Sequence, residues 1–237
     1  MTEPVALKRR LARAHRILAA GGLLPLTKGH ASARVPGSER ILILGHIHGL
    51  GRTLDTTTAD DIVTIGLDGV QVDGEIGAVG ERYIHSAVMA ARSDIGAVVH
   101  CHPTYATALG IAGIAVLPVG NRGGIFAPRV PILDFDGQID TPERGEMVRD
   151  ALGEGSAVVL ENHGIVAAGS SIDAAVVTAF ALEETAHLQW IASQVGTPKP
   201  LSAAECSRVS RGGPEHDEFF AHVWAHYAAM DPAGERD

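Results

Sequence analysis

Two histidines separated by one residue, His100 and His102, are the first feature of this sequence that could do chemistry. The apolar run at 95–99 before them predicts a buried strand, and alternate residues on a strand point to the same face. Two imidazoles on one face can converge on a single cation, as zinc and manganese sites require. Pro103 ends the strand directly afterwards, which places the pair at a strand end. Alone, the same spacing also fits two unrelated histidines at a strand edge.

Two more segments carry metal-ligating or proton-transferring side chains. The sequence E-N-H-G at 161–164 predicts a tight turn that could present His163 to a cleft. Glu81 lies four residues before His85 on a predicted helix, so the two share a face. A carboxylate near a dication can act as a ligand or move a proton. Taken singly, the turn is an ordinary polar turn and the glutamate an ordinary exposed helical residue.

Two glycine-containing segments also hold histidine. The segment K-G-H-A-S at 28–32 joins a glycine, which allows close backbone approach, to amides and a hydroxyl that can hold an anionic group. The segment H-I-H at 46–48 repeats the spacing of the first pair and competes with it for a metal ion. Because glycines surround it at 45, 49 and 51, we interpret this second segment as a flexible loop rather than a functional site.

Helices and strands mix along the chain that must position these residues. Helices are predicted over 2–20, 80–94, 103–112, 142–152, 170–194 and 218–230, with Ser170 and Asp173 as a capping box for the fifth. Strands are predicted within 26–35, 39–49, 58–65, 95–102 and 113–120, with two more within 156–169. Residues 118–140 are expected to form a long connection. No repeat or domain boundary interrupts the pattern, which predicts one α/β domain over 1–237.

Composition restricts the classes of function. A chain of 237 residues with 46% hydrophobic and 20% charged residues can bury a substantial core. Its formal net charge of −9 argues against nucleic-acid binding. Two cysteines argue against a disulfide scaffold and fit a reducing cytosol. We expect a cytoplasmic protein without a signal peptide or membrane span, and the absence of a phosphate-binding glycine motif argues against a nucleotide cofactor.

Together, these motifs resemble the class II aldolase/adducin superfamily. G-H-x-S at 29–32, E-x-x-x-H at 81–85, A-V-V-H-x-H-P at 97–103 and E-N-H-G at 161–164 occur in the family's order, and the resemblance spans about residues 5–195. It implies an αβα sandwich with a central, mainly antiparallel sheet, and a homotetramer with active sites at subunit interfaces. It also implies one Zn²⁺ or Mn²⁺ per subunit on His100, His102 and His163, with Glu81 as the acid/base carboxylate.

The resemblance also implies how an anionic small-molecule substrate is held. Gly29, His30 and Ser32 match the family's first substrate-anion loop, and His30 is a candidate to assist proton transfer. From charge and proximity in sequence, Lys28 or Arg82 could pair with a second carboxylate.

Three departures from the family bear on the substrate. Sugar-phosphate enzymes of the family use a Ser-Gly pair after the second strand, where this chain reads L-G-H-I-H-G-L-G-R-T. They also carry a Ser-Ser pair before the glutamate, where residues 78–80 are Ala-Val-Gly. A phosphate dianion needs several donors, so the loss of both pairs argues against a phosphorylated sugar. The proton-donating tyrosine of the aldolase branch is matched by Asn121.

These departures favour the family's decarboxylase-like branch. The predicted enzyme is a metal-dependent carbon–carbon lyase that removes carbon dioxide from a hydroxylated aromatic dicarboxylate, such as a dihydroxyphthalate, through a metal-stabilised enolate. Glu81 is the predicted proton donor. One alternative is a sugar-phosphate aldolase or epimerase, similar to fuculose-phosphate aldolase. Another is a non-catalytic, adducin-like interaction module, against which the metal ligands and Glu81 argue. The helical content disfavours a cupin.

Overall fold

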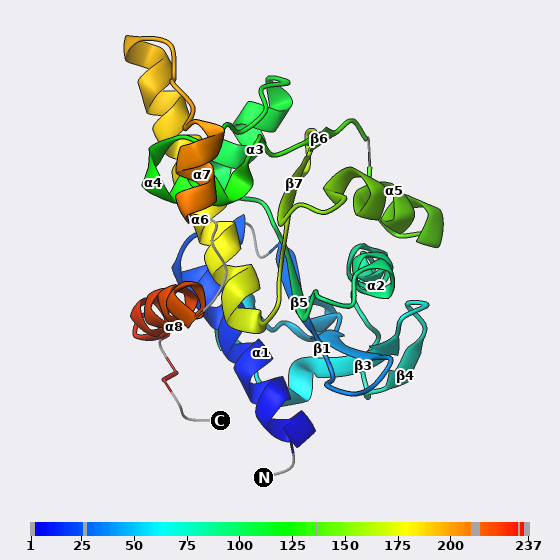
Figure 1. Ribbon diagram of the computed structural model, residues 1–237. Helices are drawn as coiled ribbons and strands as arrows, with labels where there is room; N and C mark the ends of the chain where they lie inside the picture. The colour runs from blue at the N-terminus through cyan, green and yellow to red at the C-terminus, as the bar shows by residue number, and fades with distance from the viewer. Residues whose placement is uncertain (1–2, 26–27, 136, 210–213, 232, 235–237) are drawn as a thin grey trace.

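One eight-stranded sheet forms the centre of the molecule, in the order β4-β3-β2-β1-β5-β8-β7-β6 (Figure 1). The computed structural model describes residues 3–25, 28–135, 137–209, 214–231 and 233–234. All neighbouring strands pair antiparallel except β6 and β7, so the expected α/β fold with a mainly antiparallel sheet is confirmed. The strands are β1 (Gly29–Arg34), β2 (Arg40–Leu44), β3 (Ile62–Gly66), β4 (Gln71–Asp73), β5 (Ala97–Cys101), β6 (Ile132–Leu133), β7 (Ala157–Leu160) and β8 (Gly164–Gly169).

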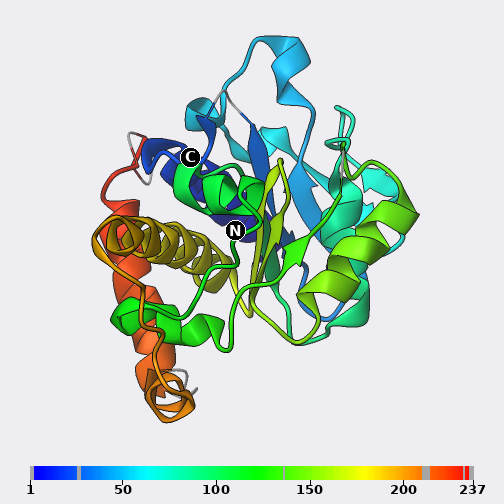
Figure 2. The same ribbon diagram turned by 90° about the horizontal axis from the view of Figure 1, so that it is seen from above.

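Helices cover both faces of this sheet and make three layers (Figure 2). Helices α2 (Arg82–Ala91) and α5 (Pro142–Leu152) pack against each other on one face. The other face carries α1 (Glu3–Ala20), α3 (Thr104–Ile111), α6 (Ile172–Val195) and α8 (Pro214–Ala228). The shorter helix α4 (Gly120–Gly123) lies beside α6, and α7 (Ala203–Val209) packs against α4 and the 3-10 turn that follows it. Because both faces are covered, β5 and β7 are buried at every residue, and both are apolar except for His100.

The register of the central strands brings three strand ends together. Strand β1 runs antiparallel to β5, and β5 runs antiparallel to β8. Gly29 pairs with Cys101, and Cys101 pairs with Ile165. The start of β1, the end of β5 and the start of β8 therefore lie side by side at one end of the sheet.

Two local predictions are wrong. Residues 113–120 form no strand. Backbone groups that would bond to a neighbouring strand bond to the Gln189 side chain instead. Its Oε1 accepts from the Leu117 amide, and its Nε2 donates to the Ala115 carbonyl. The cap of α6 is Ser171 rather than Ser170, since its Oγ accepts from the amide of Ala174.

The remaining differences lie at the edges of predicted elements. The connection predicted at 118–140 contains α4, a short turn of 3-10 helix and β6. Helix α7 and strand β4 are absent from the prediction. The predicted helix start at Thr2 lies outside the described residues, and the domain limits 1–237 stay a prediction. Within the described part of the chain, no helix is both long and apolar enough to cross a bilayer.

Candidate metal centre

The three histidines predicted as metal ligands meet where the strand ends meet. His100 lies in β5, His102 follows directly after it, and His163 occupies the turn between β7 and β8. One ring nitrogen from each lies within 4.8 Å of the others. The Nε2 atoms of His100 and His102 are 3.0 Å apart. The structure thus brings these side chains together, and their role as ligands stays a prediction.

Burial keeps these imidazoles neutral at neutral pH, as ligation requires. Burial, and secondarily the neighbouring histidines, lower the pKa of His102 to about 3. Burial and then His100 lower the pKa of His163 to about 4. Burial also lowers the pKa of His100, although Glu81 opposes the shift. The Nδ1–H of His100 donates to the Ile165 carbonyl at 3.0 Å, which leaves its Nε2 lone pair aimed at the cluster.

Glu81 lies between the histidines, at the N-terminus of α2. Its Oε2 is 3.5 Å from Nε2 of His100, and its Oε1 is 3.5 Å from Nε2 of His163. The Ile139 amide donates to Oε1 at 3.0 Å and holds the carboxylate in place. Burial alone would raise the pKa of Glu81, but the interactions with His100 and His30 and the Ile139 amide outweigh it, so the pKa is lowered and the carboxylate is ionised.

Two glycines and an asparagine shape the backbone around the cluster. A Cβ on Gly164 would lie 2.4 Å from Cδ2 of His102, and one on Gly29 would lie 2.8 Å from the carbonyl oxygen of His100. Gly29 also has φ of 121°. Asn162 adopts the left-handed conformation with φ of 55°, which is tolerated by asparagine and turns the chain so that His163 faces the cluster. The G-H and N-H-G motifs are therefore requirements of close strand packing as well as of chemistry.

A pocket of about 530 Å³ opens over this cluster. Its floor includes Glu81, His102 and His163, and one wall carries the predicted substrate loop through Lys28, Gly29 and His30. The other lining residues are His46, His48, Val79, Gly80, Phe135, Gly137, Gln138, Glu161 and Asn162.

The segment at 46–48, for which the surrounding glycines predict a flexible loop rather than a functional site, lines this pocket. Ile47–Leu50 forms a turn of 3-10 helix with buried Ile47, and this anchor leaves His46 and His48 in the pocket lining. Burial, followed by the charges of Lys28 and His46, lowers the pKa of His48. The alternation around a buried Ile47 is a signal that could have identified this pair from sequence, because both neighbours of an inward residue point outward.

Two predicted substrate contacts need correction. Ser32 is fully buried, and its hydroxyl bonds to Nδ1 of His85 at 2.7 Å instead of facing the pocket. Arg82 points away from the pocket: its Nε donates to the Gly69 carbonyl at 2.8 Å, and its guanidinium lies over the Tyr83 ring. Ser32 shares the face of β1 that carries His30, but it lies two residues further along the strand and is covered by His85 of α2. Arg82 follows Glu81 on the helix and so projects in another direction.

The donor set fits a divalent cation. Three neutral imidazoles with a nearby carboxylate are typical of zinc and related transition-metal sites. The buried Nδ1 of His163 has no hydrogen-bond partner among the described residues, so no hydrogen bond fixes this side of the ring. His30, Glu81 and His100 form a second group with atoms within 4.8 Å of one another, which makes Glu81 central to both sets.

The sequence pattern of the family described as Class II Aldolase and Adducin N-terminal domain matches residues 9–190, which is most of the chain. The chain belongs to this family. Among the curated relatives of this class II aldolase family member, 3,4-dihydroxyphthalate decarboxylase of Terrabacter sp. (strain DBF63) is 31% identical, and the match covers 97% of this chain and 99% of the relative.

Other relatives of this class II aldolase family member act on sugar phosphates, as their names state. L-ribulose-5-phosphate 4-epimerase of Salmonella paratyphi B is 30% identical over 78% of this chain and 85% of its own length. L-fuculose 1-phosphate aldolase from Glaciozyma antarctica PI12 shares the fold, with a TM-score of 0.82 and 23% identity over 99% of this chain and 93% of that one. The curated relatives named here are a decarboxylase and an epimerase, which supports an enzyme with a small-molecule substrate.

Proposed function

We propose that this protein is a metal-dependent decarboxylase of a hydroxylated aromatic dicarboxylate, such as a dihydroxyphthalate. The observation that carries the proposal is the pocket wall next to Glu81. Val79 and Gly80 line it and offer no hydroxyl or charge, and Phe135 contributes an aromatic side chain. A flat apolar ring fits such a wall, whereas a phosphate dianion needs several donors there. The dihydroxyphthalate decarboxylase relatives support the same choice.

The proposed metal ligands are His100, His102 and His163. A divalent cation at this position, which we propose to be Zn²⁺ or Mn²⁺, supplies Lewis-acid stabilisation of the negative charge that develops as carbon dioxide leaves. The lowered pKa values of His102 and His163 keep both rings neutral at neutral pH, so both can bind the cation. The carbonyl of Ile165 fixes the ring orientation of His100.

Glu81 is proposed to move the proton. Its ionised carboxylate takes the proton of the ring hydroxyl as the substrate binds. The carbon–carbon bond then breaks and its electron pair stays on the ring as carbon dioxide departs. Glu81 returns the proton to the vacated carbon, so that the enzyme ends in its starting state. The Ile139 amide donates to Oε1 and holds the carboxylate in place for both proton transfers.

A positive side chain at the pocket wall, Lys28, suits the second carboxylate of such a substrate. Lys28 and His48 line the pocket, and the Lys28 charge is close enough to His48 to contribute to lowering its pKa. A lysine ammonium facing a carboxylate makes a charge-assisted hydrogen bond. We therefore propose that Lys28, with the Gly29 amide beside it, orients the carboxylate that is retained.

The proposal also covers the assembly. We propose a cytoplasmic homotetramer in which a neighbouring subunit completes each pocket. Exposed apolar side chains on α6, namely Leu188, Trp190 and Ile191, support a buried surface between subunits.

A substrate panel tests the proposed function. The metal-loaded protein is incubated with dihydroxyphthalates and, separately, with fuculose 1-phosphate and ribulose 5-phosphate. Carbon dioxide release from an aromatic acid is expected, without aldehyde from the sugar phosphate. Aldehyde release or epimerisation without carbon dioxide from any acid would refute decarboxylation and favour the sugar-phosphate alternative.

A further inference from the structure

Three buried side chains form a continuous chain of hydrogen bonds behind the pocket. Nδ1 of His85 is 2.7 Å from Oγ of Ser32, and Nε2 of His85 is 2.7 Å from Nδ1 of His30. His30 and Ser32 are alternate residues on β1, and His85 lies on α2 above them. The exposed fractions of Ser32 and His85 are both 0%, so water does not compete for these bonds.

The contact between Ser32 and His85 determines which atom donates in each of these hydrogen bonds. His85 is neutral, because burial and then the neighbouring imidazoles hold its pKa well below the ordinary value. A neutral imidazole has one donor and one acceptor nitrogen. In the described part of the chain, the ring of His85 is the partner recorded for the Ser32 hydroxyl. If His85 donated from Nδ1, the buried Ser32 proton would be left without an acceptor, which is costly. Ser32 therefore donates to Nδ1.

The pocket end gives the same direction. With Nδ1 of His85 accepting, its Nε2–H donates to Nδ1 of His30, and the His30 proton is on Nε2. That atom lies 3.7 Å from Oε2 of the ionised Glu81. An N–H facing a carboxylate is favourable, whereas a nitrogen lone pair facing it would be repelled. Two independent contacts at opposite ends of the chain thus select one arrangement of protons.

We infer that Ser32 and His85 are positioning residues that lock His30 in its Nε2–H tautomer, so that His30 serves as a fixed hydrogen-bond donor in the pocket and not as a base. In this arrangement Nε2 of His30 carries the hydrogen, and Nδ1 of His30 accepts from His85. A neutral imidazole N–H can stabilise developing negative charge without itself changing protonation state.

The consequence for substrate rests on the proposed function. His30 would donate to an oxygen of the hydroxylated acid beside Glu81, which leaves Glu81 as the one group of this pair that moves a proton. The tautomer itself does not depend on the substrate, so its failure and the failure of the decarboxylase proposal are distinguishable.

Neutron diffraction from the perdeuterated, zinc-loaded protein tests the tautomer directly. Deuterium is expected on Nε2 of both His30 and His85, with the Ser32 deuterium directed at Nδ1 of His85. Deuterium on Nδ1 of His30 would overturn the inference. For protein in solution, ¹⁵N resonances of the His30 ring are expected to report a protonated Nε2 and an unprotonated Nδ1. The reverse pattern would also overturn the inference.

Variants of His85 separate positioning from simple packing. His85→Gln keeps an N–H for His30 and an oxygen for Ser32, whereas His85→Leu keeps neither. At equal metal content, His85→Gln should retain kcat within about fivefold of wild type, the factor for one weakened neutral hydrogen bond. His85→Leu should lose about 10²-fold, the effect of one lost donor to a developing anion. Equal kcat for the two variants would contradict the inference.

Ser32→Ala gives a second test with a matched control. Loss of the hydroxyl removes one of the two contacts that select the tautomer, so the ¹⁵N spectrum should show part of the His30 rings in the other tautomer, with kcat lowered more than KM is raised. Ser86→Ala is the control, because it removes the same atom from a buried serine on α2. Among the described residues, the Ser86 hydroxyl forms no hydrogen bond with Ser32, His85 or His30, so this variant should leave the spectrum unchanged. A wild-type His30 spectrum in Ser32→Ala would refute the positioning role of Ser32 even if no acid were turned over.

Discussion

His30 and His100 are direct partners across β1 and β5, and their ring centroids are 5.1 Å apart. This pairing puts a donor imidazole next to the proposed metal ligands but outside their group of three. His30→Asn should therefore keep the metal content of wild type while lowering kcat about 10²-fold to 10³-fold, because one donor to the developing anion is displaced. Metal analysis and steady-state kinetics on one preparation check both parts. Loss of metal together with activity would instead make His30 a ligand.

The proposed ligand His163 sits in a turn, so its removal leaves the sheet intact. His163→Ala should bind far less than one metal per subunit after dialysis against trace metal, since two imidazoles do not form a stable site. His187→Ala is the control, because this ring stacks on Tyr105 at 3.8 Å, away from the pocket. Elemental analysis of both variants is the measurement. Full metal retention in His163→Ala would refute this ligand.

Glu81→Gln separates proton transfer from metal binding. The amide oxygen of glutamine can still accept from Ile139, so the side chain stays in place and the three histidines still bind the metal. Turnover should fall about 10²-fold to 10⁴-fold, the usual contribution of a general acid/base. Metal analysis shows whether the site is intact. Undiminished turnover would remove Glu81 from the mechanism.

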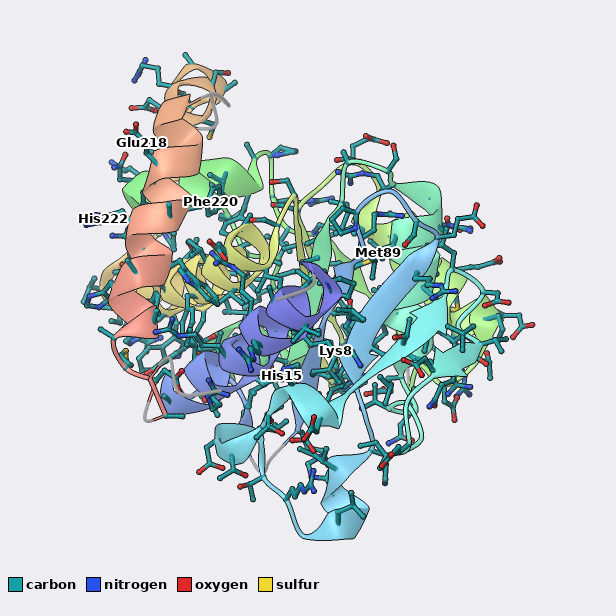
Figure 3. All side chains as sticks on the ribbon, turned by 90° about the horizontal axis from the view of Figure 1, so that it is seen from below. Lys8, His15, Met89, Glu218, Phe220 and His222 are labelled. Carbon is teal, nitrogen blue, oxygen red and sulfur yellow. The ribbon has the colours of Figure 1, made fainter. Side chains whose placement is uncertain are left out.

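His15 on α1 makes the fold sensitive to acid (Figure 3). Its Nδ1–H donates to the Leu11 carbonyl at 2.8 Å and its Nε2 accepts from the Ala31 amide at 2.9 Å, so the ring is neutral and fully buried. Burial lowers its pKa from 6.5 to about 4, although the bond to Leu11 opposes the shift. The unfolded state therefore binds a proton that the folded state does not, and stability present above pH 6.5 is lost as the pH falls toward 4.

Urea unfolding of the metal-free protein measures this loss. Between about pH 7 and about pH 5, His15 should contribute a decrease of about 2 kcal/mol in the free energy of unfolding. His15→Gln can still accept from Ala31 but does not titrate. It should be less stable at about pH 7 and should lose less stability on acidification. Equal pH slopes for the two proteins would contradict the assignment.

The proximity of His100 and His102 could be predicted, because two residues that are two apart at the end of one strand point to the same side. Glu81 and His163 could be placed near them only through the whole set of motifs, since the contacts join α2, β5 and the turn after β7. Most strands and helices followed from periodicity and breakers, such as Pro142 at the start of α5, whereas the mainly antiparallel sheet was expected from the family resemblance.

What could not be predicted depends on contacts between distant segments. The strand expected at 113–120 is replaced by side-chain bonds to Gln189, which lies far along the chain. Ser32 looked like a substrate contact because its motif gives no sign of the bond to His85. The same bond turned two separate motifs, H-x-S and E-x-x-x-H, into one buried chain.

Carbon dioxide stoichiometry in heavy water is the most direct measurement of the proposed activity. Metal-loaded protein is given a dihydroxyphthalate in D₂O, and carbon dioxide and the aromatic product are quantified together. Decarboxylation through Glu81 predicts one carbon dioxide per product molecule and one deuterium at the vacated ring carbon, with neither formed by Glu81→Gln. The proposed function would be contradicted if metal-containing wild-type protein left the acid unchanged but cleaved or epimerised a sugar phosphate.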